Sequence, residues 1–104
     1  MAERLNKDSF QEKVLNASGL AIADFYSDSC IPCKKLSPIL ADLDEKYPDV
    51  YIGKVNIVYE QDLIEEYSVM SSPVLIFFKN GEEVDRITGA VSKHKIEEAI
   101  EKNK

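Results

Sequence analysis

The amino-acid sequence predicts an α/β fold in which four helices flank a central mixed β-sheet of four or five strands. Short apolar segments typical of buried strands alternate with amphipathic helical patterns along the 104 residues. Residues 74–78, VLIFF, form an almost uninterrupted apolar run, as expected of a strand that is covered on both faces. The dipeptide Asn80-Gly81 follows this run and favours a two-residue turn between antiparallel strands.

The expected elements follow the order strand, helix, strand, helix, strand, helix, strand, strand, helix, at residues 2–6, 8–16, 20–26, 31–47, 50–57, 60–67, 74–78, 82–89 and from about 92. The first helix is expected to begin at Asp8, because an Asp followed three residues later by Gln11 is a typical capping pattern. The next segment, LAIADFY, is short and apolar like a buried strand. Apolar residues then recur at helical spacing from Leu36 to Tyr47, and Pro48 marks the end of that helix.

The second half of the chain continues this alternation. The segment VYIGKVNI predicts another core strand, and the short helix after it directs Leu63 and Tyr67 inward. The Asn-Gly turn makes the two strands that it joins antiparallel. The last helix carries Ile96 and Ile100 on one face. Because helices cover both faces of such a sheet, a functional site is expected at the carboxyl ends of the strands.

Composition and charge argue against several classes of protein. The length of 104 residues suits a single domain, 1–104, which is expected to act as a monomer. No apolar run approaches the about 20 residues that span a bilayer, and the polar N-terminal segment lacks a secretory signal. A cytoplasmic protein without membrane contact is therefore expected. The net charge of −6 argues against nucleic acid as a partner, because phosphate binding needs a basic face.

The two cysteines, Cys30 and Cys33, are the candidate reactive groups. A disulfide-stapled fold would need more pairs at longer spacings, so this pair is either redox-active or part of a metal site. A metal site usually needs four ligands, and the chain adds only His94, which is expected on the surface of the last helix. A metal shared across a dimer would receive four thiolates, and this binding module remains an alternative.

The position of the pair predicts its chemistry. Cys30 is expected at the first turn of the helix, where unpaired backbone N–H groups and the helix dipole favour a thiolate. Cys33 lies one turn further on the same face and is expected to be more buried and to stay protonated longer. Cys30 would attack a partner disulfide, and Cys33 would then resolve the mixed disulfide. Pro32 suits the first helical turn, where its missing N–H is not needed.

Four segments resemble the thioredoxin family, with the spacing of that family: ADFYSDSCIPCKKLSP, KVNI, SSPVLIFFKNG and ITGAVSK. The resemblance implies a thioredoxin-like fold and a protein-disulfide reductase, whose partners are thioredoxin reductase and disulfide-containing target proteins. It implies no bound cofactor, because NADPH or ferredoxin would supply electrons only through the reductase.

The resemblance also implies roles for single residues. Cys30 matches the nucleophile of the family and Cys33 its resolving cysteine. Asp24 matches a buried acid, and burial would raise the pKa of this carboxyl until it can accept the Cys33 proton near neutral pH. Lys54 matches a lysine whose charge approaches that acid.

Further positions match the substrate-binding surface of the family, to which Ile31 and Pro32 also belong. Pro73 matches a cis-proline, whose geometry leaves the backbone of Ser72 free to pair with an extended substrate strand. Gly89 matches a glycine of the substrate groove, where close approach excludes a side chain.

Several residues depart from the family pattern. Ser29, Ile31 and Ser72 stand where Trp, Gly and Ile are usual, the chain has no Trp, and Tyr26 occupies the position of another family tryptophan. These departures leave open a second possibility, a more oxidising redox partner of one enzyme. If the Ser72 hydroxyl donates a hydrogen bond to the Cys30 sulfur, it stabilises the thiolate and makes the disulfide more oxidising.

Overall fold

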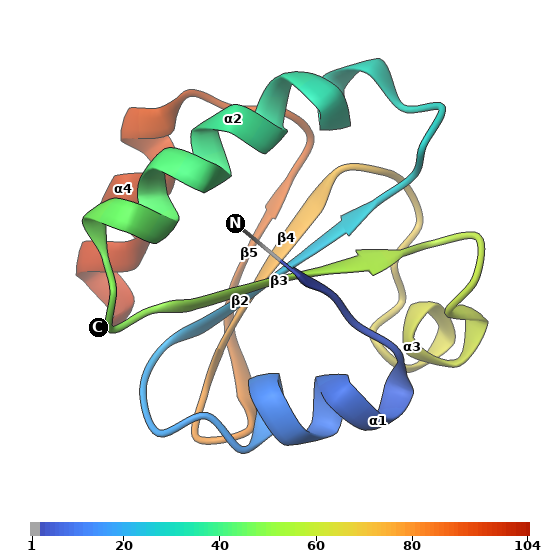
Figure 1. Cartoon of the computed structure of the whole chain (residues 1–104), viewed down its shortest axis with the longest axis horizontal. Helices are drawn as coiled ribbons and strands as arrows, with labels where there is room; N and C mark the ends of the chain where they lie inside the picture. The colour runs from blue at the N-terminus through green and yellow to red at the C-terminus, as the bar shows by residue number, and fades with distance from the viewer. Residues whose placement is uncertain (1–2) are drawn as a thin grey trace.

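The computed structural model describes residues 3–104 and contains a five-stranded sheet with helices on both faces (Figure 1). Its elements are β1 (Glu3–Arg4), α1 (Lys7–Phe10), the π-helix η1 (Gln11–Leu15), β2 (Ala21–Tyr26), α2 (Ile31–Lys46), β3 (Tyr51–Asn56), α3 (Gln61–Glu66), β4 (Val74–Lys79), β5 (Glu82–Thr88) and α4 (Lys93–Asn103). The strand order is β1-β3-β2-β4-β5. Strands β1, β3 and β2 are parallel, whereas β4 is antiparallel to both β2 and β5. The predicted α/β fold with a mixed sheet is confirmed.

Each face of the sheet carries its own hydrophobic core. Helices α2 and α4 lie together on one face, and α1 and α3 lie on the other (Figure 1). In the first core, Leu40 of α2 and Ile100 of α4 pack with Phe77 of β4. In the second, Phe10 of α1 packs edge to face against Phe78 of β4, with ring centroids 5.5 Å apart. Because alternate residues of β4 enter opposite cores, its apolar run is continuous, as the sequence predicted.

The first helix begins earlier than predicted. Asn6, not Asp8, is its N-cap: the Asn6 side chain accepts a hydrogen bond of 2.8 Å from the Ser9 N–H. The Ser9 hydroxyl in turn accepts a bond of 2.9 Å from the Asn6 N–H, which completes a reciprocal capping box. The predicted first strand is present as β1 but is shorter than 2–6: it ends at Arg4, because Asn6 already caps the helix, and residue 2 lies outside the described residues.

The two edge strands of the sheet are poor pairing surfaces. Strand β1 is two residues long, and β5 is largely exposed and rich in charge, with Glu82, Glu83, Asp85 and Arg86.

None of the helices between residues 3 and 104 combines the length and the apolar character that crossing a bilayer requires.

Candidate active site

The cysteine pair lies where the sequence predicted it, at the start of α2. Cys30 is the N-cap of this 16-residue helix, and its Sγ accepts a hydrogen bond of 3.1 Å from the Cys33 N–H. The two cysteines form a disulfide, with their Cα atoms 5.2 Å apart. Cys33 is only 5% exposed, whereas Cys30 is half-buried. The predicted difference in burial between the two cysteines is therefore confirmed.

A short loop carries the pair beyond the carboxyl end of β2. The strand ends at Tyr26, and the Cys30 N–H donates a bond of 3.3 Å to the Ser27 carbonyl. Ile31 and Pro32 belong to the first turn of α2. An N–H in this turn has no helical partner, so the missing N–H of Pro32 costs the helix no hydrogen bond. The Ile31 side chain is 66% exposed, so the nucleophile candidate is bordered by apolar surface.

Asp24 is buried in the middle of β2. It is 1% exposed, and its Oδ1 has no hydrogen-bond partner among the described residues. Burial raises the pKa of this carboxyl to about 7, although the positive charge of Lys54, which lies opposite it on β3, acts to lower it. Asp24, Cys33 and Lys54 line one cavity of 130 Å³, so the structure brings these three predicted residues together.

Tyr26 is tied into this group more closely than the sequence indicated. The Lys54 Nζ lies 4.4 Å from the centroid of the Tyr26 ring, and the Arg4 Nε donates a bond of 2.9 Å to the Tyr26 hydroxyl. Sequence reasoning missed Arg4. No local pattern indicated it, because Arg4 reaches Tyr26 only through the pairing of β1 with β3, in which Arg4 lies opposite Lys54.

The Ser72–Pro73 peptide bond is cis, which confirms that prediction. Pro73 precedes Val74, and Val74 pairs with Phe25 at the carboxyl end of β2, so this loop lies at the same end of the sheet as the cysteines. Gly89 adjoins it, with a φ of +88°. Among residues 3–104, no hydrogen bond joins the Ser72 hydroxyl to the Cys30 sulfur in this disulfide form.

Exposed apolar side chains at this end of the sheet were not singled out from the sequence. Val58 and Tyr59, in the turn after β3, are 61% and 66% exposed, and Met70, just before the cis-proline loop, is 90% exposed. Like Ile31, they lie in segments that join the strands at this end of the sheet. Their place in the sequence could have indicated them, because each lies in a connection at the carboxyl end of β3 or just before β4.

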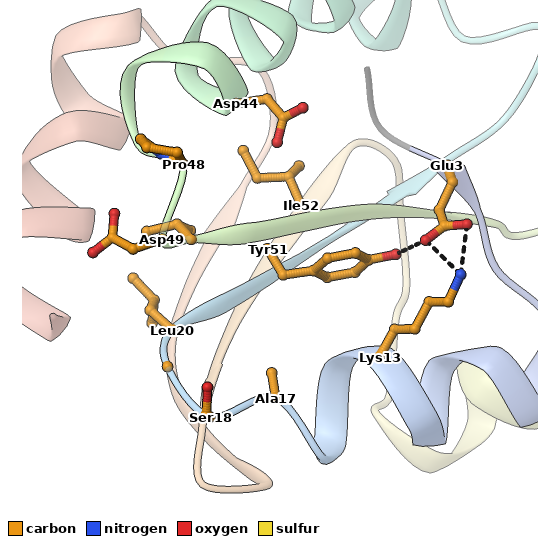
Figure 2. Close-up of a pocket in the computed structure, with 12 residues that line it drawn as sticks. Glu3, Lys13, Ala17, Ser18, Leu20, Asp44, Pro48, Asp49, Tyr51 and Ile52 are labelled. Carbon is orange, nitrogen blue, oxygen red and sulfur yellow. Dashed lines mark hydrogen bonds and ion pairs between the residues drawn. The ribbon is translucent and has the colours of Figure 1, made fainter.

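A separate cavity of 760 Å³ lies near the amino ends of β2 and β3, away from the sulfurs (Figure 2). At its rim the Tyr51 hydroxyl donates a bond of 2.6 Å to Glu3 Oε1, and Lys13 Nζ lies 2.8 Å from the same oxygen. The hydrogen bond from Lys13 holds the pKa of Glu3 below its usual value. These contacts fasten β1 to η1 and β3, and this cavity contains no residue predicted to be functional.

His94 is exposed on α4, as predicted, and its Nε2 lies 3.8 Å from the Glu98 carboxylate. Among residues 3–104, no three side chains of His, Cys, Asp or Glu gather closely enough to hold a metal ion.

A sulfur held at a helix N-cap, bonded to a second sulfur one turn away, is the arrangement of thiol–disulfide oxidoreductases. The family model for thioredoxin matches residues 1–102. A thioredoxin of Chlamydia pneumoniae is 39% identical over 103 residues, which cover 99% of each chain. A thioredoxin of Chlamydia caviae is 47% identical over 77 residues, which cover 74% of this chain and 76% of the relative.

The chain belongs to the thioredoxin family. Its CxxC pair, Cys30 and Cys33, is the redox-active centre, and its activity is protein-disulfide reduction by thiol–disulfide exchange. The family implies a reductase and target proteins as partners.

Proposed function

We propose that this chain reduces disulfides in target proteins with Cys30 as the nucleophile and Cys33 as the resolving cysteine. The observation that carries this assignment is the hydrogen bond from the Cys33 N–H to the Cys30 Sγ at the N-cap of α2. A negative charge on Cys30 is stabilised there by a backbone donor and by the helix dipole. Cys33, which is buried, lacks the exposure needed to attack a protein disulfide first.

The exchange proceeds in two displacements. The Cys30 thiolate attacks one sulfur of a target disulfide, so that a mixed disulfide forms and the first target thiolate leaves. The Cys33 thiol then loses its proton, and its sulfur attacks the Cys30 Sγ. This breaks the mixed disulfide, releases the second target thiolate and closes the Cys30–Cys33 bond. The target gains two electrons and this chain loses two.

Asp24 is the acceptor for the Cys33 proton in this proposal. Its pKa of about 7 suits a group that takes up and releases a proton near neutral pH. The shared cavity of 130 Å³ is large enough for water to relay the proton between the carboxyl and the sulfur. Lys54 supplies the positive charge that stabilises ionised Asp24.

The target is expected to bind across the loops that surround Cys30. In this proposal Ile31 and Pro32 contact it on one side, and the cis-proline loop with Ser72 and Pro73 contacts it on the other. Gly89 leaves open space beside that loop, since a Cβ there would meet no atom of the chain within 4 Å.

The remaining parts of the proposal concern the setting of the reaction. The chain is a single domain that acts as a monomer in the cytoplasm. Thioredoxin reductase regenerates its dithiol with electrons from NADPH or ferredoxin, and the chain itself binds no cofactor. The net charge of −6 favours protein partners over nucleic acid.

The test is insulin reduction with a reductase, using wild type, Cys30→Ser and Cys33→Ser. Both variants are expected to lose turnover by at least about a hundredfold. Only Cys33→Ser should trap a mixed disulfide with the target, because its nucleophile remains. A Cys30→Ser variant with full turnover, or equal alkylation of both thiols at neutral pH, would contradict the assignment.

A further inference from the structure

Tyr26 is held at two points by two cations from neighbouring strands. The Lys54 Nζ lies 4.4 Å from its ring centroid, and its hydroxyl accepts the 2.9 Å hydrogen bond from the Arg4 Nε. Tyr26 is 6% exposed, whereas Lys54 is half-buried and Arg4 is exposed, so the ring is buried and the two cations reach it from the solvent side. The phenol ring therefore separates two like charges and attracts both of them, one to its face and the other to its oxygen.

The strand register brings this group to Asp24. Lys54 lies opposite Asp24 in the pairing of β2 with β3, and opposite Arg4 in the pairing of β1 with β3. Asp24 and Tyr26 are two residues apart on β2 and project from the same face. Both of them, with Lys54, line the 130 Å³ cavity that reaches Cys33.

The ammonium group of Lys54 contacts the ring and not the carboxylate. In the described part of the chain no salt bridge within 4 Å joins Lys54 to Asp24, and the Asp24 Oδ1 has no hydrogen-bond partner. A lysine stem is long and flexible, and a half-buried lysine can turn its charge into solvent. The contact with the Tyr26 ring opposes this motion and keeps the Lys54 ammonium group at the wall of the cavity.

We propose that Tyr26 is a positioning residue for disulfide exchange: its ring holds the Lys54 ammonium beside Asp24, and the Arg4 hydrogen bond holds the ring. The position of the lysine charge then sets how readily Asp24 accepts a proton. This inference rests on the proposed role of Asp24 as acceptor of the Cys33 proton.

Other charged groups also surround the carboxyl and must be kept constant in a test. Those that line the cavity or contact its wall, besides Asp24 and Tyr26, are Lys54 of β3, Arg4 of β1, Cys33 and Lys34 of α2, and Asp28 of the loop after β2. In the oxidised protein Cys33 does not titrate. The experiment therefore uses the oxidised chain and leaves Arg4, Asp28 and Lys34 unchanged.

The experiment follows the Asp24 carboxyl carbon by NMR through a pH titration. It compares wild type, Tyr26→Leu, Lys54→Met and the double variant that carries both changes. Tyr26→Leu is expected to raise the titration midpoint by about 0.5 pH unit, the size of one cation–ring contact. Lys54→Met should raise it at least as far. In the Lys54→Met background Tyr26→Leu should add nothing, because no ammonium remains to be held.

A purely structural role gives a different result. If Tyr26→Leu changes only the hydration of the cavity, it shifts the midpoint equally with and without Lys54, and the proposal fails. Tyr26→Phe keeps the ring and loses only the hydroxyl, so it folds even if the leucine variant does not. It is expected to give a smaller rise, and no rise at all overturns the part assigned to Arg4.

The titration is independent of turnover, so the two proposals can fail separately. Full insulin-reducing turnover in Asp24→Asn would remove the acceptor role of Asp24 while leaving the coupling of Tyr26 to Lys54 intact. If both proposals hold, the acid limb of the pH–rate profile in Tyr26→Phe moves upward by the same amount as the NMR midpoint.

Discussion

The Gly89 N–H donates a hydrogen bond of 2.8 Å to the carbonyl of Pro73. This bond fastens the end of β5 to the cis-proline loop, so these two segments are held as one unit at the same end of the sheet as the cysteine pair. Gly89 adopts a φ of +88°, a conformation that side-chain-bearing residues rarely accept. A side chain there would also project into open space, since its Cβ would have no atom of the chain within 4 Å.

We expect Gly89→Ala to lower the free energy of unfolding by about 1 kcal/mol, because of the positive φ. We also expect it to raise KM for a protein disulfide several-fold while leaving the reaction with DTNB, a small disulfide, unchanged. The reason is that only a protein target would meet the added methyl group. Urea unfolding and steady-state kinetics with both substrates measure the two effects.

Gly81→Ala provides the matched control. Gly81 has a similar φ of +81° but lies in the turn between β4 and β5, at the opposite end of the sheet. It should lose at least as much stability, because a Cβ there would also lie 3.3 Å from the Leu15 carbonyl oxygen, and it should keep the wild-type KM. Equal KM changes in the two variants would show that Gly89 does not border the bound target.

Asp24 should make the stability of the oxidised protein fall as the pH rises. The carboxyl ionises near pH 3.9 in the unfolded chain and at about 7 in the folded chain, the pKa being raised by burial. Between these values the folded state binds the extra proton, so the free energy of unfolding decreases with pH, in total by roughly 4 kcal/mol. Urea midpoints measured from pH 4 to pH 8 report this decrease.

The comparison that isolates Asp24 is Asp24→Asn, which cannot ionise. Other carboxyls, such as Glu97, whose pKa the neighbouring Lys46 lowers, titrate alike in both proteins. The difference between wild type and variant should therefore change by several kcal/mol across this range and level off above about pH 8. A constant difference would mean that Asp24 has an ordinary pKa in the folded protein.

Ser72→Ile should make the disulfide more reducing by about 30–60 mV, if the Ser72 hydroxyl stabilises the Cys30 thiolate in the reduced protein. Removing that donor destabilises the dithiol relative to the disulfide. Redox titration against glutathione or dithiothreitol measures the potential. A shift of this size would favour the more oxidising, specialised partner over a general reductase.

Two further variants separate the hydroxyl from the bulk of the side chain. Ser72→Thr keeps the donor and should retain the wild-type potential. Ser71→Ile adds the same bulk one residue away, at an exposed position, and should also leave the potential unchanged. The same potential in Ser72→Ile as in wild type would remove the role of this hydroxyl.

The order of strands and helices could be predicted because each element carries its own apolar pattern. Strand β4 is the clearest case, since every residue from Val74 to Phe78 is buried. The start of the first helix could not be fixed in this way. Asn6 and Asp8 can both cap a helix, and the choice depends on the Ser9 hydroxyl, which reaches the Asn6 N–H and not that of Asp8. The π-helix η1 likewise has no local sequence pattern that distinguishes it from an α-helix.

The central part of the site was predictable for a similar reason. Cys30 and Cys33 are neighbours on one helix, and the burial of Asp24 follows from the apolar residues around it in β2. The contact between Arg4 and Tyr26 is of another kind. It joins residues 22 positions apart on two strands that are not neighbours in the sheet, so it depends on the strand order and on side-chain conformations.

The charged, exposed strand β5 and the two-residue strand β1 have a consequence for how this protein meets other chains. The unpaired backbone groups of a flat, neutral edge strand can pair with any extended segment, so that copies of one protein aggregate edge to edge. Neither edge strand of this sheet is long and uncharged enough for such pairing. Under the proposed function, extended segments of target proteins dock instead at the loops beside the sulfurs.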